Sequence, residues 1–184
     1  EVKLVSRRPF FGWWEYYLEN PIYTFPTNQS WAGSALTNIK GEILGIGSLF
    51  IRDATSPGIF SPGNMFVPVN LLKPILQDLK KYGHRKSDLK PYIGLSPIEN
   101  KGKIIVSRVS IDGPSDIAGI KKNDVIISMN GNLIKNLQNF YLYLWNIGKS
   151  EALIDIIVLR DGKKIHFKVR SKDRMNYYVK NKTY

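Results

Sequence analysis

The tetrapeptide Tyr92-Ile-Gly-Leu has the residue types that can hold a carboxylate through backbone groups. Gly94 allows a turn tight enough for neighbouring N–H groups to converge, and converging N–H groups form a nest for a peptide carboxylate. Taken alone, the same residues favour an ordinary strand-turn-strand. Together with the motifs that follow them in the chain, Tyr92, Ile93, Gly94 and Leu95 are candidate peptide-binding residues.

The segment after the loop, residues 95–99, is predicted to be a β-strand whose edge can pair with an extended peptide. Pro97 removes one donor from that edge, so we expect the pairing to be weaker or shorter than in an uninterrupted strand.

Side chains suited to catalysis are scarce in this sequence. The absence of cysteine excludes disulfides, thiolate zinc sites and cysteine nucleophiles, but it leaves the cellular compartment open. The two histidines, His84 and His166, fit ordinary surface or strand positions. We therefore expect no metal site and no cofactor.

The net charge of +12 raises the alternative of a nucleic-acid or anionic-membrane partner. The charge is concentrated in residues 160–184, where nine Lys and Arg stand against two Asp, a net of +7. A solvated strand edge and a basic tail explain this concentration, and no nucleic-acid motif accompanies it. We do not expect a nucleic-acid partner.

The first part of the chain has the pattern of antiparallel β structure. We predict strands at residues 2–8, 22–25 and 65–69, and a hairpin that turns at Lys40-Gly41 into a buried strand over residues 42–51. A helix capped by Asn70 should follow from Leu71 to Tyr82 and stop at Gly83. The aromatic segment from Phe10 to Tyr17 is either a packing layer or a partner surface.

A second β-rich pattern follows a short polar linker. It contains a helix from Leu137 to about Ile147, capped by Asn136 and closed by Gly148. We predict four regions: a first domain at 1–84, a linker at 85–90, a second domain at 91–171 and a basic tail at 172–184. No apolar run has membrane-spanning length, and the chain starts without methionine or a signal peptide, which favours a processed product or a fragment.

The second domain resembles the PDZ domains of HtrA/DegP-type proteases through four motifs in the same order and spacing. They are Tyr92-Ile-Gly-Leu, Gly102-Lys-Ile-Ile-Val-Ser-Arg-Val, Gly113-Pro-Ser-Asp-Ile-Ala-Gly-Ile-Lys-Lys-Asn-Asp-Val-Ile-Ile-Ser-Met-Asn-Gly and Leu153-Ile-Asp-Ile-Ile-Val-Leu-Arg-Asp-Gly-Lys-Lys. The resemblance implies a peptide groove between the helix and the strand after the glycine loop.

By that resemblance, Leu137, Tyr141 and Leu144 face the ligand and Phe140 belongs to the core. A leucine at the first of these positions implies a preference for hydrophobic peptide ends. The alternative is that all of these side chains are core residues.

The first domain resembles the C-terminal part of a trypsin-like HtrA protease. The family run Gly-Asn-Ser-Gly-Gly-Pro-Leu corresponds to Ser30-Trp-Ala-Gly-Ser-Ala-Leu, and the family element Phe-Ala-Ile-Pro corresponds to Met65-Phe-Val-Pro. The resemblance implies a partial antiparallel β-barrel followed by a PDZ domain, a mainly β fold with a few helices.

The same resemblance places Ala32 at the position of the nucleophilic serine, with Ser30 and Gly33 in the oxyanion-hole region. A methyl group can neither attack a carbonyl nor be activated by a base, so this chain should not cleave peptides. Ser30 and Ser34 are the alternatives for a shifted nucleophile, but the position of Ala32 has the elbow geometry. The family's catalytic His and Asp belong to the barrel half that precedes this sequence.

Two origins of Ala32 remain open: a natural loss, which makes the protein a pseudoprotease, or an engineered Ser-to-Ala change. The neighbouring departures at Trp31, Ser34 and Ala35 favour natural loss. If the first barrel half is absent, the open sheet edges need covering, which predicts either self-association or an upstream segment.

We predict an HtrA-like serine protease homologue that recognises peptides or unfolded protein through its PDZ domain and does not catalyse. The enzyme-class alternative is a fragment or Ser-to-Ala mutant of an active endopeptidase in protein quality control. A second alternative is a basic surface-binding protein acting through residues 160–182. The resemblance implies a periplasmic or cell-envelope location, with peptide ligands and a homo-oligomer as partners.

Overall fold

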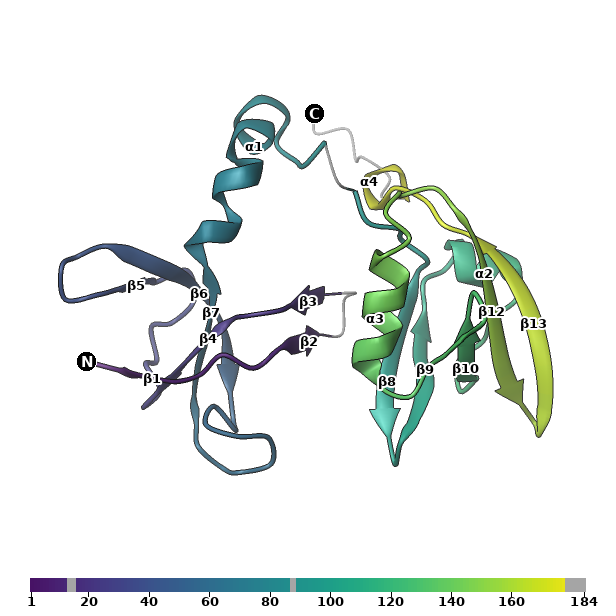
Figure 1. The fold of residues 1–184 in the computed structure, drawn as a ribbon, viewed down its shortest axis with the longest axis horizontal. Coiled ribbons are helices and arrows are strands. Elements are labelled where there is room, and N and C mark those ends of the chain that lie inside the picture. The colour runs from purple at the N-terminus through teal and green to yellow at the C-terminus, as the bar shows by residue number, and fades with distance from the viewer. Residues whose placement is uncertain (13–15, 87–88, 178–184) are drawn as a thin grey trace. The chain divides into compact units, whose positions relative to one another are not determined.

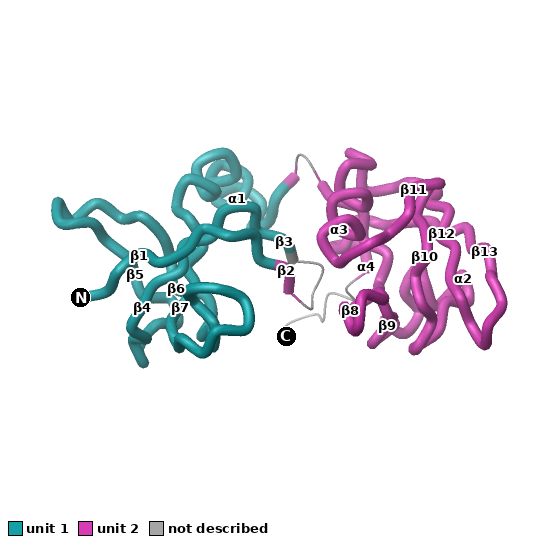
Figure 2. The backbone as a smooth tube through the Cα atoms, turned by 60° about the horizontal axis from the view of Figure 1, so that its bottom comes forward, with its two compact units in different colours: residues 1–10, 17–85 teal, residues 11–16, 86–184 magenta. Residues whose placement is uncertain are grey.

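The structure is a computed structural model that describes residues 1–12, 16–86 and 89–177. It divides into two units, which Figure 2 shows in different colours. Unit 1 comprises residues 1–10 and 17–85, and unit 2 comprises residues 11–16 and 86–184.

Unit 1 is built on an antiparallel five-stranded sheet with the strand order β1-β4-β7-β6-β5 (Figure 1). In sequence order its strands are β1 (Lys3–Ser6), β4 (Ile22–Phe25), β5 (Ala35–Thr37), β6 (Ile43–Ile51) and β7 (Gly63–Pro68). The described ends of the aromatic segment form a separate two-stranded sheet from β2 (Phe10–Gly12) and β3 (Tyr16–Leu18), and residues 13–15 lie outside the described residues. The predicted hairpin between β5 and β6 is present.

The prediction that β6 is buried is wrong. Its buried positions are Gly45 and Gly47, whereas Leu44 and Ile46 are 39% and 41% exposed. Successive residues of a strand point to opposite faces, so the two glycines lie on the covered face and the large apolar side chains on the other. Most of the buried apolar residues of unit 1 lie instead on β4 and β7, namely Ile22, Tyr23, Met65 and Phe66.

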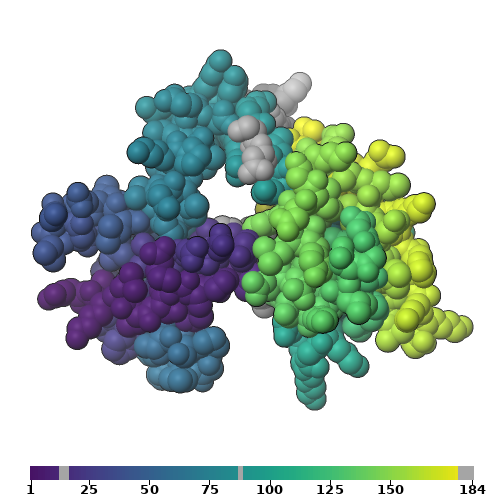
Figure 3. All heavy atoms as spheres, in the orientation of Figure 1, coloured from purple at the N-terminus to yellow at the C-terminus, as the bar shows by residue number. Residues whose placement is uncertain are grey.

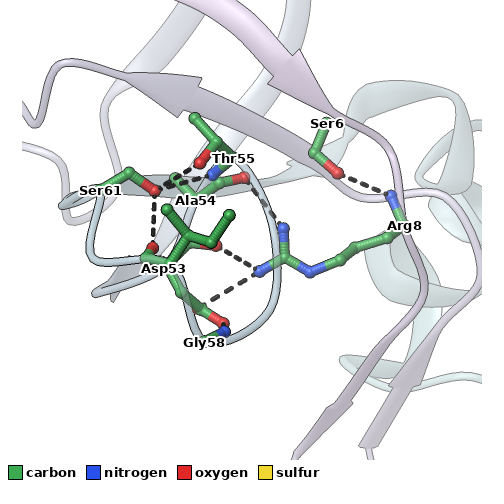
Figure 4. Close-up of polar contacts among 8 residues, drawn as sticks. Ser6, Arg8, Asp53, Ala54, Thr55, Gly58 and Ser61 are labelled. Atoms are coloured by element: carbon green, nitrogen blue, oxygen red, sulfur yellow. Dashed lines mark hydrogen bonds and ion pairs between the residues drawn. The ribbon is translucent and has the colours of Figure 1, made fainter.

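Arg8 ties the chain after β1 to the loop between β6 and β7 (Figure 4). Its guanidinium donates to the carbonyl oxygens of Ala54 at 2.9 Å and Asp53 at 2.7 Å, and it pairs with the Asp53 carboxylate at 3.3 Å. Within the same loop, the hydroxyls of Thr55 and Ser61 are 2.7 Å apart. These contacts fix a loop that has no regular secondary structure over most of its length.

The helix that was predicted to start at Leu71 starts later. Residues 69–75 form two 3-10 turns, η1 (Val69–Leu71) and η2 (Lys73–Ile75), and the α-helix α1 spans Leu76–Tyr82. Pro74 lies in η2 and has no N–H to donate, so the regular α-helical bonds begin only after it. Asn70 therefore lies inside η1 rather than capping a helix, whereas Gly83 ends α1 in the left-handed conformation as predicted.

Unit 2 contains a sheet in the order β13-β12-β10-β9-β8, with β11 paired to β10. Its strands are β8 (Leu95–Asn100), β9 (Lys103–Val109), β10 (Val125–Met129), β11 (Asn132–Leu133), β12 (Leu153–Arg160) and β13 (Lys163–Arg170). Three helices accompany them: α2 (Pro114–Ala118), α3 (Leu137–Trp145) and α4 (Arg174–Tyr177). The Asn136 side chain caps α3 as predicted, since its Oδ1 accepts from the N–H of Asn139 at 2.7 Å.

An ion pair between the half-buried Arg160 and the buried Asp124 joins the end of β12 to the turn before β10. The Arg160 guanidinium donates to both carboxylate oxygens of Asp124, at 2.6 and 2.7 Å, and to the carbonyl of Gly119 at 2.9 Å. Asp124 is 1% exposed, and it also accepts from the N–H of Lys121 at 2.9 Å. The hydrogen bond to Asp124 raises the pKa of Arg160, which stays charged.

The fold class predicted from the sequence is confirmed: a mainly β chain with few helices, a half-barrel sheet and a second β-rich domain. Among the residues that the structure describes, no helix is long and apolar enough to cross a membrane.

Candidate functional site

The loop before β8 presents two backbone N–H groups without acceptors. In the part of the chain that the structure describes, the N–H groups of Ile93 and Gly94 donate to no hydrogen-bond acceptor. Both residues are buried. Buried backbone groups are nearly always paired in proteins, so two adjacent unpaired donors point to a site for an anionic or carbonyl ligand.

The orientation of these N–H groups is set by the carbonyl oxygens of the same peptide units. A peptide bond is planar and trans, so its C=O and N–H point in opposite directions. The carbonyl of Ile93 accepts from the N–H of Ser115 at 2.9 Å, which directs the N–H of Gly94 away from α2. The carbonyl of Tyr92 accepts from the N–H of Lys172 at 3.0 Å, which likewise directs the N–H of Ile93 away from Lys172.

Gly94 is required at its position for two reasons. Its φ is +71°, in the region that side chains other than glycine rarely adopt. A Cβ atom there would also lie 3.3 Å from the Cβ of Ser110, whose N–H donates to the carbonyl of Gly94 at 2.9 Å. The loop thus combines a left-handed turn with close packing, as the sequence predicts.

The strand next to this loop, β8, is the last strand in the order of its sheet. Its register with β9 shifts between Ser96 and Pro97, and Pro97 lies opposite Val106. β8 therefore has the edge position that was predicted for pairing with a peptide, with the donor missing at Pro97.

Helix α3 places the three predicted ligand-facing side chains in different surroundings. The N–H of Leu137 donates to the Glu99 carboxylate of β8 at 3.0 Å, so the start of α3 is tied to the far end of the strand. Leu144 and the predicted core residue Phe140 are fully buried.

Tyr141 is also fully buried, and part of its cover comes from the aromatic segment within unit 2. Its hydroxyl donates to the carbonyl of Gly12 at 2.9 Å, and its ring lies 6.3 Å from that of Phe11 in a stacked arrangement. A peptide would therefore contact Tyr141 only after displacing Phe11 and Gly12.

In unit 1, Ala32 lies in an exposed turn that is packed against β6. The carbonyl of Trp31 accepts from both the N–H and the hydroxyl of Ser34, at 3.0 and 2.8 Å, and the N–H of Gly33 donates to the carbonyl of Gly47 at 2.9 Å. A side chain at Gly47 would overlap the Trp31 carbonyl, so this glycine permits the close approach. The hydroxyl of Ser34 is thus engaged with the backbone of its own turn.

The N–H of Ser30 is also engaged. It donates to the side-chain oxygen of Asn28 at 3.0 Å, and the N–H of Asn28 donates to the side-chain oxygen of Asn64 at 2.6 Å. An oxyanion hole needs N–H groups that are free to point at the substrate. This hydrogen bond of the Ser30 N–H was not predicted from the sequence. An Asn is a signal for such a turn, because its side chain can accept from the backbone N–H two residues later.

The histidines lie apart from any cluster of metal ligands. His84 follows α1 in unit 1, and His166 is an exposed residue of β13 in unit 2. Among the described residues, no group of three or more His, Asp or Glu side chains is placed to hold a metal ion.

Two surface hollows of unit 2 lie away from the loop at residues 92–95. One is lined by residues of β10, β12 and β13. The other is lined by Met129, Asn130, Asn132, Tyr143, Asn146 and Ile147. The candidate site is defined by backbone donors and a strand edge, which are the groups that peptide recognition by strand addition uses.

The described part of the basic stretch runs along β13, whose yellow atoms lie at the surface in Figure 3, while Lys180 and Lys182 lie outside the described residues. Lys164, Lys168 and Arg170 are exposed, whereas Arg160 is occupied by Asp124. This distribution fits a solvated strand edge as well as it fits a binding surface.

A sequence model of the PDZ domain family matches residues 91–170. The chain is 27% identical over 159 residues to the serine protease Do-like HtrA of Bacillus subtilis, covering 76% of this chain and 34% of the relative. It is 27% identical over 160 residues to a probable periplasmic serine endoprotease DegP-like of Rickettsia conorii, covering 78% of this chain and 29% of the relative. The chain thus spans about a third of the length of these relatives.

Among solved structures, the crystal structure of the serine endoprotease from Yersinia pestis matches with a TM-score of 0.52 and 26% identity. The match covers 84% of this chain and 52% of that chain. It includes both units, so the half-barrel sheet and the second domain have counterparts in one protease chain.

Proposed function

Because residues 91–170 form a PDZ domain in a homologue of the HtrA/DegP-type serine proteases, we propose that the chain binds the C-terminal ends of peptides or unfolded proteins. The terminal carboxylate accepts from the N–H groups of Ile93 and Gly94, and the residues before it pair with the edge of β8. The loop residues Tyr92 and Leu95 flank these donors, and Leu137 lies across from β8 on α3.

The observation that carries this proposal is the pair of unpaired, buried N–H groups beside an edge strand. A carboxylate satisfies both donors at once, and hydrogen bonds to an ionised acceptor are about twice as strong as those between neutral groups. An internal peptide segment has only carbonyl oxygens to offer, so chain ends should be preferred.

The test compares free-acid and C-terminally amidated decapeptides that end in Val, Leu or Phe, by fluorescence anisotropy with the whole chain. We expect the free acids to bind at least tenfold more tightly, because amidation removes the charge. Equal affinities for the two forms would contradict the proposal.

Gly94→Ala should weaken binding of the free acids, because the added Cβ crowds Ser110 and disturbs the donors. Gly102→Ala is the matched control: Gly102 also has positive φ, +70°, but a Cβ there meets open space. Both variants carry similar backbone strain, so a binding loss that is common to both would count against a role for Gly94 in the site.

The protease-like unit contributes no peptide cleavage in this proposal. The position of Ala32 has no nucleophile, the hydroxyl of Ser34 donates to its own turn, and the N–H of Ser30 is already bonded to Asn28. The protein then acts in protein quality control of the periplasm or cell envelope as a recognition protein. The name of the Rickettsia relative supports the periplasmic location only.

The enzyme-class alternative, an active endopeptidase in which Ala32 replaces a serine, is tested by A32S in a chain extended by the family's preceding barrel half, because a serine at position 32 needs the His and Asp of that half. We expect that A32S reacts with a fluorophosphonate probe no faster than the unchanged chain, because the engaged N–H of Ser30 leaves the oxyanion hole incomplete. Labelling at position 32 would favour the endopeptidase.

A further inference from the structure

The segment after β13 contacts the carboxylate-binding loop at several points, among them Tyr92. This segment, residues 171–177, is named the brace here. It is anchored in unit 2 by Ser171, whose hydroxyl donates to the carbonyl of Ser150 at 2.8 Å and whose N–H donates to the carbonyl of Ala152 at 2.9 Å. Ser171 is buried, so the brace starts from a fixed point.

The first contact is a backbone bridge one residue before the unpaired donors. Tyr92 and Lys172 exchange two hydrogen bonds, each 3.0 Å long. One of these bonds holds the carbonyl of Tyr92, which belongs to the same planar peptide unit as the N–H of Ile93. The brace therefore sets the direction in which the first of the two donors points.

The second contact holds the Tyr92 ring. The ring of Tyr177 lies 5.0 Å from it, and the guanidinium of Arg174 lies 5.6 Å from its centre. The Tyr92 hydroxyl donates to the hydroxyl of Ser110 at 3.0 Å. Tyr92 is consequently fixed at both its backbone and its side chain, at 5% exposure.

The third contact joins the brace to Ile111, in the segment that follows β9. The hydroxyl of Tyr177 donates to the carbonyl of Ile111 at 2.6 Å. Ile111 follows Ser110, whose N–H holds the carbonyl of Gly94 and whose side chain packs closest to Gly94. Tyr177 thus bridges Tyr92, at the start of the loop, and the segment that supports Gly94.

We propose that the brace fixes the orientation of the Ile93 donor and supports the turn at Gly94, with Tyr177 and Arg174 as positioning residues for the carboxylate of the peptide. This inference rests on the proposed function, since it names what sets the geometry of that same site. A nest works only while its donors converge, so loosening the brace weakens carboxylate recognition more than it weakens pairing along β8.

The test uses Tyr177→Phe in the whole chain. This change keeps the ring against Tyr92 and removes only the donor to Ile111. The probes are the free-acid and amidated decapeptides ending in Val, Leu or Phe. We expect the free acids to bind about fivefold more weakly, which corresponds to the net contribution of one hydrogen bond. The affinity of the amides should be unaffected. Tyr177→Ala should lose more, because the ring contact is lost as well.

Tyr143→Phe is the matched control, since it removes a tyrosine hydroxyl from the hollow beside α3 on the same unit. Arg174→Lys should retain most of the binding that Arg174→Met loses. The midpoint of thermal unfolding distinguishes a positioning effect from a loss of stability. In Tyr177→Phe the ratio of the affinities for free-acid and amidated peptides should fall while the midpoint stays unchanged.

An unchanged ratio in both Tyr177 variants, or an equal loss for acids and amides, would overturn the inference and leave the proposed function intact. If the unaltered chain does not distinguish acids from amides, the proposed function fails first, and the inference fails with it.

Discussion

Tyr23 is a residue whose ionisation is opposed by the fold. Its ring is buried in unit 1 with the guanidinium of Arg8 4.2 Å from its centre. Burial raises the pKa of Tyr23 to about 12, while Arg8 lowers it and Asp53 raises it by smaller amounts. The folded state favours the neutral form of Tyr23. The contribution of this buried neutral side chain to stability is complete below about pH 10 and is lost as pH rises from 10 to 12.

We predict that the free energy of unfolding falls by about 2 to 3 kcal/mol more in the unaltered chain than in Tyr23→Phe between pH 9 and pH 12. Phenylalanine keeps the ring against Arg8 and cannot ionise, so every other titrating group is shared by the two proteins. Urea unfolding at a series of pH values measures the difference. Parallel curves for the two proteins would show that Tyr23 titrates normally.

Single residues were predicted well where a local rule governs them. The need for glycine at position 94 and the cap at Asn136 follow from backbone sterics and from one side-chain bond, and both are present. The cover of Tyr141 by Phe11 and Gly12 could not be predicted, because it joins residues more than a hundred positions apart. The brace was missed for the same reason: Tyr177 and Ile111 are 66 positions apart and share no motif.

At the scale of elements, the strands were predicted better than the first helix. The short run between Pro21 and Pro26 defines β4 correctly, since the structure has the strand at Ile22–Phe25 as predicted. The helix after β7 was predicted too early because an apolar pattern does not distinguish 3-10 turns from an α-helix, and Pro74 decides between them. The burial of β6 was misjudged because a strand's sequence does not tell how many faces of its sheet are covered.

The ion pair between Arg160 and Asp124 should dominate the stability of the elements that it joins. Arg160→Met leaves a buried carboxylate without its cationic partner, and we expect a loss of about 3 to 5 kcal/mol in the free energy of unfolding. Lys164→Met removes an exposed charge from the neighbouring strand and should change stability by less than about 0.5 kcal/mol. Urea unfolding of both variants checks the prediction, and similar small losses in both would contradict it.

At the scale of the whole molecule, unit 1 exposes large apolar side chains that a globular domain would normally cover. On β6 these include Ile43, Leu44, Ile46 and Phe50. Contiguous exposed apolar surface usually marks an interface, either with another chain or with a preceding segment of the same protein. The strand order leaves β1 and β5 as the two ends of the sheet, so the open edges predicted from the sequence are present in the described part of the chain.

We therefore expect the 184-residue chain to self-associate when it is studied alone. Sedimentation equilibrium should give an average mass above the 21.0 kDa of one chain, increasing with protein concentration. Ile46→Lys should shift the distribution toward the single chain, because a charge on the exposed face of β6 opposes association. The matched control, Lys164→Met, lies on unit 2 and should leave it unchanged. A single-chain mass at all concentrations would contradict the prediction.

Pro97 also affects whether two copies of this protein can pair along β8. An edge strand with an unbroken row of donors is a template on which the same strand of a second copy can continue the sheet, and such growth leads to aggregation. The missing donor at Pro97 and the register shift beside it interrupt that row in β8. A second copy of the protein could pair with β8 only through this interrupted row of backbone donors. A peptide ligand is held by its terminal carboxylate as well. Pro97, which shortens the pairing of a peptide with β8, therefore also prevents the edge of β8 from extending the sheet into a second molecule.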